Sequence, residues 1–163
     1  MSLRTVEWIT KESGKLVTGF VRMVEQTRLP VALEYLDTDD PKVVWEAIRM
    51  LRVRGAPAIG VAAALGVAAG LQHVRPDDTG LLIREVNRLA DYLATSRPTA
   101  VNLFWALDRM RRVAAAHASL APSDFVERMA REAVAIRDED AAMCHAIGEH
   151  GVSLLQDGWT ILT

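Results

Sequence analysis

The sequence predicts an α+β fold, in which a small antiparallel β meander precedes a helical bundle. Two observations indicate this order. Residues 1–36 contain short runs of β-branched and aromatic residues between turn signals, whereas residues 37–155 carry apolar residues at helical spacing between caps and prolines. Half of the 163 residues are hydrophobic, which is enough for one core. We therefore divide the chain into a meander over residues 1–36, a helical part over residues 37–155 and a terminal segment over residues 156–163.

Three strands are expected in the meander. Residues 5–10 alternate between apolar and polar side chains, and residues 16–24 are rich in valine. The Leu29-Pro30 pair then interrupts the sheet, and residues 31–36 are expected to form the third strand. Gly19 inside the second run indicates a bulge. So small a sheet needs helices to bury one of its faces.

The first helix is expected to begin after the aspartates at 39 and 40, which offer a side-chain cap ahead of Pro41. It should end near Arg54-Gly55. Residues 56–70 then form a run of small apolar residues without a single charge, which predicts a buried helix with Pro57 in its first turn.

Three more helices complete the expected bundle. Asp78 or Thr79 caps one that runs to Ala94, and the next runs from Pro98 to about residue 118. Ser123 is expected to cap a long helix towards Leu155, in which Gly148 marks a candidate interruption.

Two of these helices start in the same way, because Arg54 and Arg97 each stand just ahead of a proline-containing first turn. A cation at that end faces the positive pole of the helix dipole, which is unfavourable unless an anion lies between them. The free N–H groups of a helix start, with Gly55 allowing close approach, suit a phosphate. Two alternatives stay open: a plain core helix entered through an Arg-Gly turn, and a ligand-free helical domain in which both arginines form structural salt bridges.

An acidic run at residues 138–140, close to Cys144 and His145, raises the question of a metal site. The spacing does not match the two-histidine zinc signatures, so we expect no metal, a solvated acidic face and a semi-buried Cys144. Neither a nucleophile with a base nor a phosphate-binding glycine loop is recognisable. We therefore expect no catalytic residue within this chain.

Composition excludes several classes of protein. A net charge of −2 with interspersed signs offers no nucleic-acid footprint, and a single cysteine excludes an internal disulfide framework and fits a reducing compartment. The uncharged run at residues 56–74 approaches the length of a membrane span, but its small residues, Gln72 and His73 favour a buried helix. We expect a soluble, cytoplasmic protein.

The terminal segment predicts a further strand. A turn at Asp157-Gly158 leads into an apolar run that ends at Thr163. A helix, a turn and an apolar strand begin α/β units with a parallel sheet, and a lone strand has nothing to pair with. We therefore expect the chain to be part of a longer protein.

Residues 54–64, with the sequence RGAPAIGVAAA, resemble the 5-methylthioribose-1-phosphate isomerase family. Further segments that match the family in order and spacing are residues 25–30, 96–103, 146–151 and 161–163. The wider family includes ribose-1,5-bisphosphate isomerase and the regulatory subunits of the exchange factor for translation initiation factor two.

The resemblance implies an aldose–ketose isomerase of methionine salvage that uses no cofactor and acts on a sugar 1-phosphate. It implies that Arg54, the backbone of Gly55 and Ala56, and Arg97 hold the substrate phosphate. A Rossmann-like domain, absent from this chain, would carry the catalytic cysteine just after Thr163, a distant catalytic aspartate and the contacts of a homodimer. The chain alone would then be inactive. Another pentose 1-phosphate, or a non-catalytic regulatory module, are the alternatives.

Overall fold

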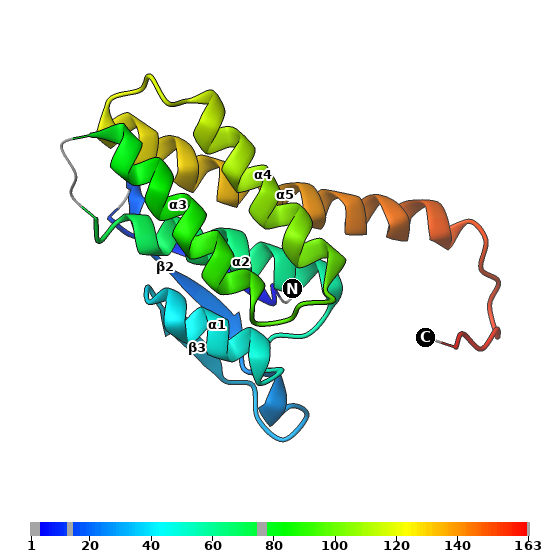
Figure 1. Ribbon diagram of the computed structural model, residues 1–163. Helices are drawn as coiled ribbons and strands as arrows, with labels where there is room; N and C mark the ends of the chain where they lie inside the picture. Colours follow the sequence, from blue (N-terminus) through cyan, green and yellow to red (C-terminus); the bar gives the residue numbers. More distant parts are fainter. Residues whose placement is uncertain (1–3, 13–14, 75–77, 163) are drawn as a thin grey trace.

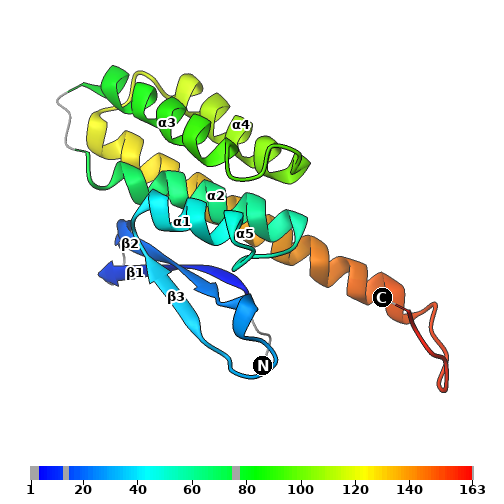
Figure 2. The same ribbon diagram turned by 60° about the horizontal axis from the view of Figure 1, so that its bottom comes forward.

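The computed structural model describes residues 4–12, 15–74 and 78–162. A three-stranded antiparallel sheet lies against a layer of helices, so the predicted α+β class is confirmed (Figure 1). The strands are β1 (Val6–Glu12), β2 (Lys15–Val24) and β3 (Tyr35–Thr38), in the spatial order β1-β2-β3 expected of a meander. Figure 2 shows the helices stacked on one face of this sheet.

The third strand lies further along the chain than predicted. β3 pairs Tyr35 with Val24 and Thr38 with Val21, so the residues between must first turn the chain back, partly through a short 3-10 helix at Gln26–Arg28. The apolar residues 31–33 do not extend the sheet: they lie outside any strand, and Val31 is 94% exposed.

The irregularity predicted near Gly19 is present. The register shifts between Thr10, which pairs with Gly19, and Glu12, which pairs with Lys15. Glycine is required here because a Cβ atom on Gly19 would lie 2.5 Å from the ring of the buried Trp8.

Five helices follow: α1 (Pro41–Arg49), α2 (Ala56–Leu71), α3 (Thr79–Ala94), α4 (Val101–Ala116) and α5 (Pro122–Val152). Two predicted caps are confirmed, since the carboxylates of Asp40 and Asp78 accept hydrogen bonds from the N–H groups of Lys42 (2.8 Å) and Gly80 (2.9 Å). None of the helices in the described part of the chain is long and apolar enough to cross a bilayer.

Three predicted helix features are wrong. Pro98 does not start α4 but lies inside a turn that Ala100 closes by donating to the Arg97 carbonyl (3.0 Å), a position that proline favours. Ser123 does not cap α5, because Pro122 already occupies its first turn. Gly148 does not interrupt α5, since glycine only weakens a helix by about 1 kcal/mol.

The predicted buried helix is the centre of the fold. Every residue of α2 from Ile59 to Leu71 is buried, because the sheet and the other four helices all pack against it. The end of α5, by contrast, projects from the body and leads into residues 153–162, which form turns and no strand (Figure 1). Residues 159–162 thus lack a strand partner within the described chain.

Candidate functional site

The start of α2 and the loop before α4 enclose a hollow of about 420 Å³. Gly55, Ala56 and Ile59 line it from α2, and Arg97 faces them together with residues 99–102. Three of the four residues predicted to bind a phosphate, Gly55, Ala56 and Arg97, therefore lie together in the structure although some 40 residues separate them in sequence. Arg54 is not among the residues that line this hollow.

Gly55 leaves the first backbone N–H groups of α2 uncovered beside the hollow. Its φ of +96° lies in the left-handed region, and it is the N-cap of α2 without any side-chain hydrogen bond. The first N–H groups of a helix have no intrahelical partner, and here no capping side chain covers them. Pro57 contributes no N–H in the first turn, and the other amides of that turn have no capping side chain and are available to a ligand.

The two arginines at this end of the molecule form no ion pair within the described residues. Arg97 is half-buried, and Arg54 is exposed. Arg54 only donates from Nε to the carbonyl of Leu51 (3.3 Å). The alternative in which both arginines form structural salt bridges is therefore not what the structure shows.

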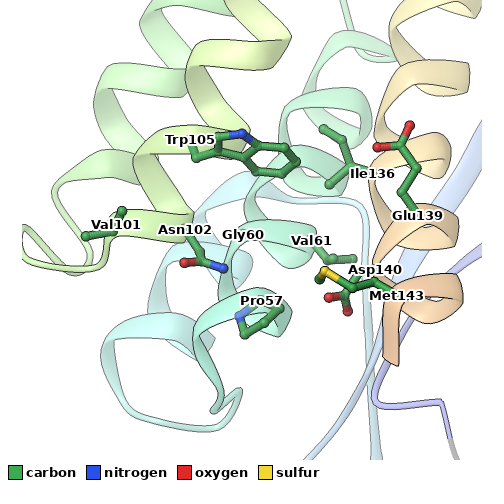
Figure 3. A pocket seen from close by; sticks show the side chains of 10 residues that line it. All are labelled: Pro57, Gly60, Val61, Val101, Asn102, Trp105, Ile136, Glu139, Asp140 and Met143. Atoms are coloured by element: carbon green, nitrogen blue, oxygen red, sulfur yellow. The ribbon is translucent and has the colours of Figure 1, made fainter. Parts of the chain in front are cut away.

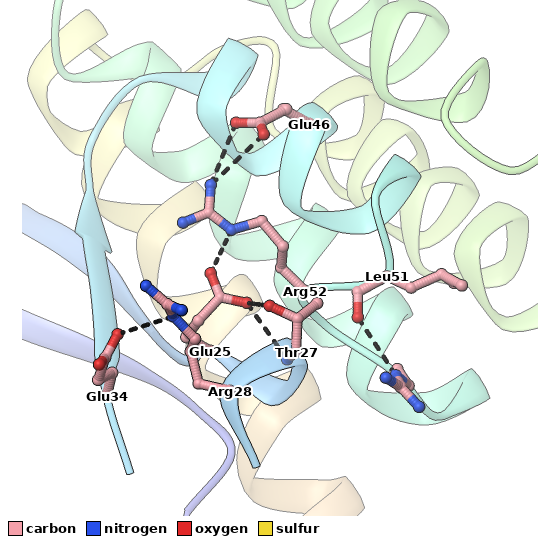
Figure 4. Close-up of polar contacts among 8 residues, drawn as sticks. Glu25, Thr27, Arg28, Glu34, Glu46, Leu51 and Arg52 are labelled. Carbon is pink, nitrogen blue, oxygen red and sulfur yellow. Dashed lines mark hydrogen bonds and ion pairs between the residues drawn. The ribbon is translucent and has the colours of Figure 1, made fainter. Parts of the chain in front are cut away.

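Arg52, in contrast, is held by two carboxylates (Figure 4). Its guanidinium donates to the buried carboxylate of Glu25 and reaches Glu46 at 3.2 Å. Thr27 also donates to Glu25, from its hydroxyl at 2.6 Å and from its N–H at 3.3 Å. Burial alone would raise the pKa of Glu25, but these hydrogen bonds and the charge of Arg52 outweigh it and lower that pKa.

This cluster around the buried Glu25 ties the segment after β2 to the turn that carries Arg54. The backbone adds two links, because Gln26 donates its N–H to the Arg52 carbonyl (3.0 Å) and its side-chain amide to the Arg54 carbonyl (3.4 Å). Sequence reasoning missed this support. Opposite charges at positions 25 and 52 are too far apart in sequence for any local pattern to pair them.

Within the part of the chain that the structure describes, no three His, Cys, Asp or Glu side chains are placed so that they could hold a metal ion. Glu139 instead accepts from Arg109 of α4 (2.7 Å), and His145 lies 3.2 Å from Glu149. Cys144 is exposed and not semi-buried as predicted, because α5 is exposed throughout residues 141–145.

Comparison with known proteins places this geometry in a family. Over its whole length the chain is 46% identical to methylthioribose-1-phosphate isomerase of Geobacter metallireducens, and it is 49% identical over 145 residues to 5-deoxyribose 1-phosphate isomerase of Moorella thermoacetica. The first match includes 100% of this chain and 45% of the relative's length. The second includes 89% of this chain and 41% of the relative's length. The chain thus spans less than half the length of the curated relatives it matches.

Two solved structures share the fold. The 5-methylthioribose 1-phosphate isomerase of Pyrococcus horikoshii superposes with a TM-score of 0.86 at 32% identity, over 96% of this chain and 42% of that one. The delta subunit of translation initiation factor eIF-2B from A. fulgidus superposes with a TM-score of 0.81 at 34% identity, over 96% of this chain and 43% of that one. The family model described as the Initiation factor 2 subunit family matches residues 52–163, which is more than half of the chain. These matches confirm the resemblance predicted from the motifs, and the chain belongs to the Initiation factor 2 subunit family.

Proposed function

We propose that this chain is the substrate-phosphate-binding part of an aldose–ketose isomerase that converts 5-methylthioribose 1-phosphate to 5-methylthioribulose 1-phosphate in methionine salvage. The observation that carries the proposal is the hollow lined by both the uncapped start of α2 and Arg97, which forms no ion pair within the described residues. The names of the relatives supply the reaction.

In this proposal the phosphate accepts hydrogen bonds from the Arg97 guanidinium and from the free N–H groups at Gly55 and Ala56. Arg54, on the turn just before them, adds a second positive charge. Charge-assisted hydrogen bonds from a planar guanidinium match a phosphate well, and the helix dipole adds to them. These groups hold the substrate in position and have no acid or base of their own to offer at C1 or C2.

The chemistry then belongs to groups outside this chain. Ring opening and the transfer of hydrogen between C1 and C2 need an acid and a base, which the family resemblance assigns to a cysteine beyond Thr163 and a more distant aspartate. We propose that the complete enzyme is cytoplasmic, works without a cofactor and forms a homodimer through its Rossmann-like domain. The 163-residue chain alone should show no turnover of 5-methylthioribose 1-phosphate.

Binding measurements on the purified chain test the proposal. Titration calorimetry should detect 5-methylthioribose 1-phosphate, and Arg97→Ala should weaken it at least tenfold, because a hydrogen bond to a charged group contributes about 1.5–3 kcal/mol. Arg112→Ala, which removes an exposed arginine of α4 without an ion pair in the described residues, is the matched control. Equal affinities for all three proteins, or turnover by the chain alone, would contradict the proposal.

A second candidate is a non-catalytic regulatory module, favoured by the family description and by the similarity to the eIF-2B delta subunit. This module would not bind a sugar phosphate at Arg97. A related enzyme for ribose 1,5-bisphosphate or another pentose 1-phosphate would bind its own substrate there. Parallel titrations with these sugar phosphates separate the candidates.

A further inference from the structure

The proposed phosphate site combines two helix starts with one turn. The helix starts belong to the packed core, because Ile59 in the first turn of α2 and Leu103 in that of α4 are buried. Next to them, Pro57 and Trp105 line a further hollow of about 400 Å³ between these two helices and α5 (Figure 3). Arg54 lies outside this packing, since it is exposed and belongs to the connection between α1 and α2. Its position therefore depends on contacts outside the helices.

The connection between α1 and α2 has a strained backbone. Leu51 has a φ of +59°, in the left-handed region that side chains other than glycine disfavour. Its N–H donates to the carbonyl of Ile48 at 3.4 Å, and the N–H of Arg52 donates to that of Ala47 at 2.9 Å, which closes α1 with a Schellman motif. A strained backbone of this kind persists only where surrounding contacts hold it in place.

Those contacts come from residues 25 and 26, just after β2 (Figure 4). Glu25, which is 7% exposed, accepts a hydrogen bond from the guanidinium of Arg52. Gln26 donates its N–H to the carbonyl of Arg52 at 3.0 Å and its side-chain amide to the carbonyl of Arg54 at 3.4 Å. Val53, between these two arginines, is completely buried. The backbone that leads into the phosphate site is thus held at three successive residues.

We infer that Glu25 and Gln26 are positioning residues of the phosphate site. Glu25 acts through Arg52, and Gln26 acts through the carbonyl of Arg54. Together they hold Arg54 and Gly55 beside the hollow, which neither Glu25 nor Gln26 lines. The inference rests on the proposed function. A site that is already ordered loses no binding free energy to ordering its own backbone, so phosphate affinity depends on two residues that do not touch the ligand.

Glu25→Gln distinguishes positioning from a simple effect of charge, because the two predict opposite results. Glu25 is an anion like the ligand, so its removal strengthens phosphate binding if only charge matters. If Glu25 positions the turn, the same substitution weakens binding, since a neutral amide holds the Arg52 guanidinium less strongly. We expect calorimetry on the 163-residue chain to show about fivefold weaker binding of 5-methylthioribose 1-phosphate.

Gln26→Ala tests the second contact without changing any charge. It removes the hydrogen bond to the Arg54 carbonyl and keeps the backbone bond to Arg52. Because one neutral hydrogen bond is lost, we expect about threefold weaker binding of the same sugar phosphate. The substitution is in a half-buried side chain and leaves the Glu25–Arg52 pair in place, so this variant decides alone should Glu25→Gln fail to fold.

Two further measurements separate positioning from a general loss of stability. In the ligand-free chain, NMR relaxation should show more motion at the amides of Arg54 and Gly55 in both variants than in the wild type. Glu132→Ala is the matched control, because it removes a carboxylate that is 6% exposed from α5 and should destabilise the protein. It should leave the affinity and the motion of these amides unchanged. Each titration is run where circular dichroism shows the variant to be fully folded.

Failure of the inference and failure of the proposed function give different results. If the wild-type chain binds the sugar phosphate, a variant at position 25 or 26 that binds it as tightly or more tightly overturns the positioning role of that residue, and the phosphate site stands. Equal weakening by Glu132→Ala would also overturn the inference. If the wild-type chain shows neither binding nor a shift of the Gly55 amide signal, the proposed function falls and the inference with it.

Discussion

Gly60 of α2 packs directly against the backbone carbonyl of Asn102 of α4: a Cβ atom on Gly60 would lie 2.7 Å from that oxygen. Real Cβ atoms do not approach a carbonyl oxygen this closely, so only glycine permits the observed spacing of the two helices. The contact lies one helical turn beyond Gly55 and directly beside the hollow that holds Arg97. It therefore sets the distance between the two halves of the proposed phosphate site.

Gly60→Ala should separate the start of α2 from that of α4. We expect a loss of about 1–3 kcal/mol in the free energy of unfolding, which is typical of an overpacked core, and weaker binding of phosphate at the widened hollow. Urea denaturation and calorimetric titration measure the two effects. Gly148→Ala is the control, because nothing lies within 4 Å of its Cβ position on α5 and alanine favours a helix. A Gly60→Ala protein as stable as the wild type would contradict the packing argument.

The buried carboxylate of Glu25 should make stability depend on acid. Burial opposes ionisation, but the hydrogen bonds from Thr27 and Arg52 prevail, so the folded-state pKa of Glu25 is lowered from its ordinary value of 4.5. A lowered folded pKa means that the stabilisation is present above about pH 4.5 and is lost as the pH falls through the folded pKa. Glu25→Gln should therefore lower stability at pH 7 and lessen its decline below about pH 4.5.

Urea melts between pH 3 and pH 7 measure this dependence. Glu34→Gln removes an exposed carboxylate from the neighbouring loop and serves as the control. The argument would fail if both variants followed the wild-type curve.

The buried carboxylate of Glu132 joins α5 to α4. Arg109 of α4 donates to it at 2.5 Å and Arg128 at 2.7 Å, while Arg109 also bonds Glu139. Removing one partner of a buried ion pair leaves an uncompensated charge, which typically lowers the free energy of unfolding by about 3–5 kcal/mol. We expect Glu132→Ala to lower it by about 3 kcal/mol, at the low end of that range, because Arg109 retains its bond to Glu139. Chemical denaturation measures the loss.

Glu127→Ala is the matched control for Glu132→Ala. It breaks a pair with Arg131 on the same helix, but both side chains are exposed, and such pairs contribute about 0.3–0.5 kcal/mol. Similar losses for the two variants would show that burial does not decide the strength of these pairs.

The side chain of Gln72, just after α2, forms the hydrogen bonds that a neighbouring strand would form with Gly19 of β2. β3 pairs only with residues 21–24, and the Gln72 amide instead bonds both backbone groups of Gly19, accepting from its N–H at 3.1 Å and donating to its carbonyl at 2.9 Å. Gln72→Leu should leave two partly buried groups unsatisfied and cost about 1–3 kcal/mol in a thermal or urea melt. Gln156→Leu, on the exposed terminal segment, should be close to neutral.

Local patterns in the sequence determined much of the fold. The caps at Asp40 and Asp78 act on N–H groups two residues away, so they are legible in the sequence. The composition of the uncharged run at residues 56–70 favoured a buried helix, and α2 is buried from Ile59 to Leu71. The prediction was wrong where a residue suits two local structures equally well. Pro98 fits both a turn and the start of a helix, and the path of the chain into α4 places it in the turn.

The sequence by itself determined that two arginines stand ahead of helices and that the uncharged run at residues 56–70 forms a buried helix. It could not determine that Arg97 meets the start of α2, because that contact depends on how closely α2 and α4 pack at Gly60. Nor could it pair Glu25 with Arg52 or place Trp105 opposite α5, since side chains distant in sequence meet only when the core assembles. Caps and turns follow from contacts a few residues apart, whereas a hollow between three helices exists only through their packing.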